Sequence, residues 1–130
     1  MSSFFINLLS QIEYIPAIST FAFLYVYYEK LNSKFALIIL LTFFSSLSHH
    51  IFPENNFVRL LDWGLAITLA ILLISKINSI NSIIFLLIVA AILSWLFSLI
   101  FFHYLHMNTF YEFTHSTWHL LSAYLLFIIF

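Results

Sequence analysis

The sequence predicts an all-α integral membrane protein, a helical bundle of five transmembrane helices in which residues 1–130 form a single domain. Two observations lead to this fold class. Hydrophobic residues make up 64% of the 130-residue chain and charged residues only 7%, a composition typical of polytopic membrane proteins. The apolar residues also fall into five runs, each close to the ~20 residues with which a helix spans a bilayer.

The five predicted helices follow one another with short polar connectors. Glu13 and Pro16 mark the start of the first helix, and a group of tyrosines marks its end, as expected at a membrane interface. Asn56 precedes the third helix and is a candidate N-cap. The predicted helices cover residues 11–28, 35–52, 57–75, 83–102 and 110–130, with a polar connector over 76–82.

The few charged residues predict how the chain would be oriented in a membrane. Lys30 and Lys34 lie between the first two predicted helices, and Lys76 lies between the third and the fourth. Because lysine and arginine concentrate in cytoplasmic loops, the N-terminus is expected outside and the C-terminus in the cytoplasm. The net charge of -1 gives no basis for nucleic-acid binding, and the lack of cysteine excludes disulfides and thiolate chemistry.

Histidines near the ends of the predicted helices give the strongest functional signal. His115 and His119 are four residues apart in the last helix, so both side chains share one face and can bind one metal ion. His49 and His50 end the second helix, and Asp62 lies near the start of the third. In an up-and-down bundle, the end of helix two and the starts of helices three and five lie on the same side of the membrane.

This arrangement predicts a zinc site. Three imidazoles and an open coordination position are a common way to hold catalytic zinc, and the candidate ligands are His115, His119 and one of His49 and His50. Zinc held in this way acidifies water. Asp62 would accept the proton, and Ser45, one turn below His49 on the same face, would hold the water or stabilise an oxyanion.

The same residues also have simpler explanations. Ser45 could donate to a carbonyl of its own helix, and Asp62 could form a surface ion pair with Arg59. His103 and His106, at the end of the fourth helix, are interpreted as interfacial residues because no acid or serine accompanies them. We favour the functional interpretation for the combined set, since ionisable groups inside a membrane are rare and costly.

The motifs Ser45-x-x-x-His49, Asp62 and His115-x-x-x-His119 resemble those of the CREST superfamily of membrane hydrolases. This superfamily includes the alkaline ceramidases, the progestin and adipoQ receptors and the myomaker group. The resemblance implies a zinc-dependent, ceramidase- or phospholipase-like hydrolase that acts on amide or ester bonds of membrane lipids. The family has seven helices, so in this chain the lipid pocket is expected to be smaller, or completed by another subunit in a homo- or hetero-oligomer.

Two questions stay open at the level of sequence. Ser46 and His50 fit the motif as well as Ser45 and His49, but neighbouring residues differ by about 100° around a helix. We choose His49 because Leu-Ser-His matches the sequence motif of the CREST superfamily. With His49 directed into the bundle, His50 is expected to face lipid headgroups or a neighbour. Other functions are a haem-b membrane anchor with histidine ligands from different helices, or a metal-stabilised membrane protein without catalysis.

Overall fold

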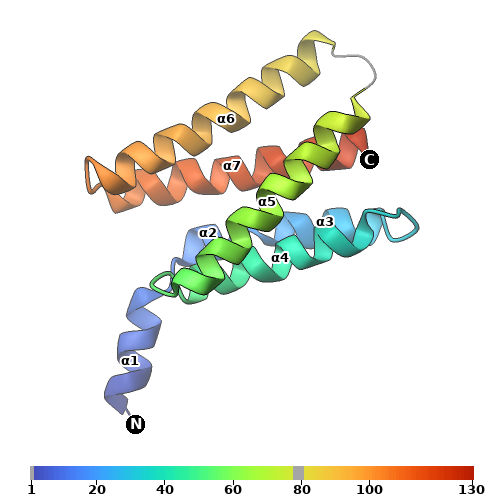
Figure 1. Ribbon diagram of the computed structural model, residues 1–130. Coiled ribbons are helices and arrows are strands. Elements are labelled where there is room, and N and C mark those ends of the chain that lie inside the picture. Colours follow the sequence, from blue (N-terminus) through green and yellow to red (C-terminus); the bar gives the residue numbers. More distant parts are fainter. Residues whose placement is uncertain (1, 78–80) are drawn as a thin grey trace.

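The computed structural model describes residues 2–77 and 81–130, and these residues form α-helices and no strands (Figure 1). The all-α class is therefore confirmed for the described part of the chain. Of the predicted connector 76–82, residues 78–80 lie outside the described residues. The helices are α1 (Ser2–Gln11), α2 (Tyr14–Ser19), α3 (Phe21–Glu29), α4 (Ala36–Ile51), α5 (Asn56–Lys76), α6 (Ser82–His103) and α7 (Asn108–Ile129).

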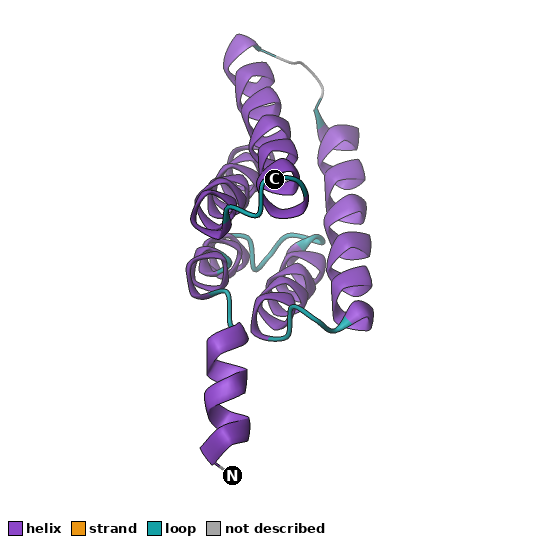
Figure 2. Ribbon diagram, turned by 90° about the vertical axis from the view of Figure 1, so that its left-hand side faces the viewer, coloured by secondary structure: helices purple, strands orange, loops and turns teal. Residues whose placement is uncertain are grey.

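The first predicted helix is divided in the structure, and Pro16 explains where it begins. A proline ring clashes with the carbonyl four residues earlier unless the proline lies in the first turn of a helix. Helix α2 accordingly begins at Tyr14, and Glu13 has a non-helical backbone with φ -82° and ψ 81°. Helices α2 and α3 meet at Thr20, whose own φ of -63° and ψ of -23° are helical. Helix α1 projects away from the other helices (Figure 2).

The other four predicted helices are present as α4 to α7, with ends that differ by a few residues from the prediction. The N-cap of α5 is Asn55 and not Asn56. Its side-chain oxygen accepts hydrogen bonds from the backbone N–H groups of Phe57 and Val58, at 3.0 and 3.2 Å. Asn56 was the wrong choice because a cap must precede the first helical residue to reach those N–H groups.

Helix α7 lies at the centre of the arrangement. It runs antiparallel to α6, and its other side packs on α2 and α3, while α5 packs mainly on α4 (Figure 1). The buried apolar side chains between these helices form one cluster. Its members are Phe23, Val26, Ile39, Phe43, Leu69, Leu73, Ala91, Ala123, Leu125 and Leu126.

Among the described helices, α5 and α6 are long and apolar enough to cross a membrane. Helix α4 is apolar but has 16 residues, so it is about 24 Å long at 1.5 Å per residue. Helix α7 has 22 residues and carries Glu112 and His115 in its first half and His119 just past its middle. Two of the five predicted spans thus meet the criteria of length and hydropathy, and the five-span bundle stays a prediction.

Candidate metal centre

Three histidines from two helices meet in the interior. His50 comes from the end of α4, and His115 and His119 come from α7; one ring nitrogen of each lies within 4.8 Å of the other two. The ring centroids are 5.0 Å apart for His50 and His115, 5.1 Å for His50 and His119, and 4.7 Å for His115 and His119. The side chains of His50 and His119 are fully buried. We call these three residues the histidine triad.

Hydrogen bonds fix the tautomer of two triad members. Nδ1 of His50 lies 2.6 Å from Oε2 of Glu13, and because a carboxylate only accepts, the proton is on Nδ1. Nδ1 of His119 lies 2.7 Å from Oγ of Ser19. The Ser19 hydroxyl donates its single hydrogen to the carbonyl of Pro16 at 2.7 Å, so Ser19 accepts from His119. Both imidazoles therefore have their free lone pair on Nε2.

The third triad member follows the same pattern. Nδ1 of His115 is 3.4 Å from Oγ of Ser98, and the Ser98 hydroxyl donates to the carbonyl of Trp95 at 2.7 Å. Ser98 thus accepts from His115, which again leaves the lone pair on Nε2. Zinc-bound histidines in proteins usually donate their other ring N–H to a carboxylate, a carbonyl or water. His50 has such a carboxylate partner, whereas His115 and His119 donate to serine hydroxyls.

The Nε2 atoms of the triad are buried and poorly satisfied. Within the described ranges, Nε2 of His50 and Nε2 of His115 have no hydrogen-bond partner. An unpaired buried acceptor costs about 1–3 kcal/mol. Nε2 of His119 lies 3.3 Å from Oγ of Ser46. A metal ion at the triad would satisfy these lone pairs, so the donor set fits a metal of the kind that imidazole binds, zinc among them.

The choice of His49 as the third ligand is corrected by the structure, which brings His50 to His115 and His119 instead. The prediction that His50 faces lipid headgroups is wrong, since its side chain is 0% exposed. His49 is also buried, at 7%, yet it does not belong to the triad and its Nδ1 has no partner among the described residues. Ser46 and His50 are one turn apart on the face of α4 that lies against His119 of α7. His49 is about 100° away from His50 around the helix axis and therefore points elsewhere.

This correction predicts different effects for two neighbouring substitutions. His50→Ala should lose most bound metal, because it removes one of three nitrogen ligands. His49→Ala should retain it and serves as the matched control in the same helical turn. Metal content measured on both purified variants decides between them; loss of metal in His49→Ala alone would contradict the placement of His50.

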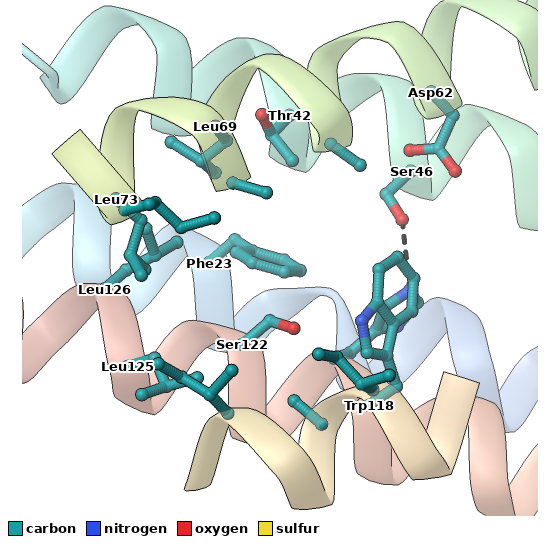
Figure 3. Close-up of a pocket in the computed structure, with 17 residues that line it drawn as sticks. Phe23, Thr42, Ser46, Asp62, Leu69, Leu73, Trp118, Ser122, Leu125 and Leu126 are labelled. Carbon is teal, nitrogen blue, oxygen red and sulfur yellow. Dashed lines mark hydrogen bonds between the residues drawn. The ribbon is translucent and has the colours of Figure 1, made fainter. Parts of the chain in front are cut away.

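The serine chosen from the sequence differs from the one beside the triad. Ser45 donates to the carbonyl of Thr42 at 3.1 Å, as the simpler explanation expected, and approaches Oδ1 of Asp62 at 3.4 Å. Ser46 lies between Asp62 and His119, and it lines the same cavity as both (Figure 3). Ser46, and not Ser45, lies beside the triad because it shares the face of α4 that carries His50.

Asp62 is where the sequence placed it, near the start of α5 and beside the serines of α4. Its side chain is 3% exposed. The alternative of a surface pair with Arg59 is wrong, because Asp62 is buried and Arg59 donates to Oδ1 of Asn56 at 2.6 Å. His103, the last residue of α6, and His106, in the connector to α7, are exposed and do not belong to the triad; their interfacial position stays a prediction.

Sequence reasoning missed Glu13, Ser19 and Ser98, the partners of the three triad histidines. A usable signal was present for Glu13. In an up-and-down bundle, the start of the first predicted helix lies on the same side as the end of the second and the start of the fifth. Glu13 is therefore expected on the same side as the histidines. Ser19 gave no signal, because a serine within a helix more often donates to its own backbone.

An apolar cavity of about 190 Å³ lies along the bundle, and His119 is the triad member that lines it. Ser46 and Asp62 lie at one end, and Leu73, Leu125 and Leu126 lie at the other (Figure 3). The cavity is lined by residues of one chain; completion by another subunit stays a prediction. The remaining lining residues are Phe23, Thr42, Ala66, Leu69, Ala70, Ile74, Ile88, Ala91, Ile92, Trp118, His119 and Ser122.

The chain was compared with protein-family models, with curated proteins and with solved structures, and no match was found in any of the three. Its likeness to the CREST superfamily therefore rests on the motif residues alone.

Proposed function

We propose that this protein is a zinc-dependent intramembrane hydrolase of lipid amide or ester bonds. One observation carries the proposal: three buried histidines bring ring nitrogens within 4.8 Å of one another, and Nε2 of His50 and of His115 has no partner among the described residues. Nε2 of the third, His119, lies 3.3 Å from Ser46, which lines an apolar cavity together with Asp62. Such a set combines a metal site, a proton acceptor and a space for a hydrocarbon chain. It matches the chemistry that the CREST resemblance implies.

The membrane part of the proposal is supported by the outer surface. Large apolar side chains are exposed along α5 and α6, among them Ile67, Ile71, Ile74, Ile83 and Leu86, each more than half exposed. Lipid tails are as apolar as these side chains, so a bilayer would cover such faces without a cost in free energy. We propose five spans, formed by α2 with α3, and by α4, α5, α6 and α7. The lysine distribution supports an N-terminus outside and a C-terminus in the cytoplasm.

In the proposed reaction the residues of the chain have separate tasks. His50, His115 and His119 would hold zinc, which when bound supplies Lewis acidity that polarises a carbonyl and acidifies water. The Asp62 carboxylate accepts the proton of the attacking water as general base. The Ser46 hydroxyl, on the cavity wall between Asp62 and His119, donates to the developing oxyanion.

The cavity supports a lipid as the substrate. On α5 its lining extends from Asp62 to Ile74, which is about 18 Å along the helix axis at 1.5 Å per residue. The polar lining residues are Thr42, Ser46, Asp62, His119 and Ser122, and the rest of the lining is apolar. An acyl chain lying in this space would bring its carbonyl carbon to the polar end, beside Asp62 and Ser46.

Haem is a weaker candidate for the triad. A haem with two histidine ligands needs its planar ring between the two imidazoles. The three triad rings contact one another at centroid distances of 4.7 to 5.1 Å, which favours a single small ion.

The proposal is tested by assaying purified protein on fluorescent ceramide and phospholipid substrates, before and after chelation. We expect hydrolysis of at least one lipid class, loss of activity with a chelator, and recovery when zinc is added. Absence of activity in a zinc-loaded protein across a broad lipid panel would favour the non-catalytic, metal-stabilised alternative.

A further inference from the structure

We propose that Glu13 is a positioning residue of the metal centre, whose carboxylate holds His50 in the tautomer and orientation that the metal requires. The inference rests on the proposed function, because it takes the histidine triad as a metal site. Its direct support is the 2.6 Å contact between Oε2 of Glu13 and Nδ1 of His50. The Glu13 side chain is only 15% exposed, so little water competes for this bond.

The backbone brings Glu13 to this position. Pro16 requires α2 to begin within the preceding turn, which leaves Glu13 outside the helix with a non-helical ψ of 81°. In this conformation the Glu13 N–H donates to the carbonyl of His50 at 2.9 Å. One residue is thus bonded to His50 at both its main chain and its side chain, which fixes the carboxylate relative to the imidazole.

Helix α7 also contacts the Glu13 carboxylate. The Tyr111 hydroxyl, from the start of α7, donates to Oε2 of Glu13 at 3.1 Å. Tyr111 is one turn before His115 and packs on its ring, with centroids 5.2 Å apart. Glu13 therefore connects the chain before α2 with the two helices that carry the triad.

Glu13 gives His50 a different electronic environment from the other triad members. His115 and His119 donate to neutral serine hydroxyls, whereas His50 donates to a carboxylate. A hydrogen bond to a charged acceptor is roughly twice as strong as a neutral one, and it raises the basicity of the ligating nitrogen. Loss of such a partner typically lowers metal affinity 10- to 100-fold.

The experiment compares zinc affinity, by competition with a chelator of known strength, in full-length wild type and four variants. Glu13→Ala removes the hydrogen-bond acceptor, and Glu13→Gln keeps an acceptor without its charge. Glu54→Ala and Glu54→Gln are the matched controls, because Glu54 is exposed in the turn between α4 and α5 on the same side of the bundle. Visible spectra of the cobalt-substituted proteins and thermal unfolding of the metal-free proteins are recorded in parallel.

We expect zinc affinity to fall about 10- to 100-fold in Glu13→Ala and less in Glu13→Gln, with no change in either Glu54 variant. The cobalt spectrum should change in the Glu13 variants, which a merely structural role of Glu13 would not cause. If Glu13→Ala does not fold, Glu13→Gln decides. Equal affinity and equal spectra in Glu13→Gln and Glu54→Gln would overturn the inference while leaving the triad intact. A wild-type protein that binds no zinc would instead overturn the proposed metal site itself.

Discussion

Asp62→Asn is expected to keep its zinc and its fold but to hydrolyse lipid amides or esters at least about a hundred times more slowly. Asparagine has nearly the same shape as aspartate, and the three nitrogen ligands of the triad remain. What is lost is the group that takes the proton from water, and general-base catalysis typically contributes 10²- to 10⁴-fold. The measurement is the rate on fluorescent ceramide and phospholipid, with zinc content determined on the same samples.

The matched control for this substitution is Glu54→Gln, which removes an exposed carboxylate by the same change of one atom. Its rate should equal that of wild type. Equal rates for Asp62→Asn and wild type would remove Asp62 from the mechanism. Equal zinc content, together with no hydrolysis in either protein, would favour a structural metal.

The double variant His115→Ala, His119→Ala should lose both metal and activity. It leaves one of the three triad nitrogens, and a single imidazole does not make a zinc site. The pair His103→Ala, His106→Ala removes two exposed histidines on the same side of the bundle and should change neither property. Full zinc content in the His115, His119 double variant would show that the metal is bound elsewhere in the chain.

The all-α class could be predicted because the apolar residues fall into runs of helical length separated by short polar connectors. Predicted helices 35–52, 57–75, 83–102 and 110–130 correspond to α4, α5, α6 and α7. The division of the first predicted helix at Glu13 was not predicted, although Pro16 supplies its physical cause. The number of membrane spans depends on the bilayer as well as the chain, so helix length and hydropathy support α5 and α6 and leave the others as proposals.

The site could be predicted in part. Spacing of four residues identified His115 and His119, and the position of Asp62 followed from the count of helices. The choice between His49 and His50 could not be made reliably, because Ser45 with His49 and Ser46 with His50 have the same spacing of four residues, so helical periodicity does not separate the two pairs. Glu13 contacts His50 through a non-helical backbone, and helical periodicity says nothing about such contacts.

The central claim is that the histidine triad binds zinc, and the metal content and absorption spectrum of the purified wild-type protein test it most directly. We expect about one zinc per chain, as for a three-histidine site, and no visible absorption band. A protein with no stoichiometric metal, or one that shows the Soret band of haem, would contradict the account.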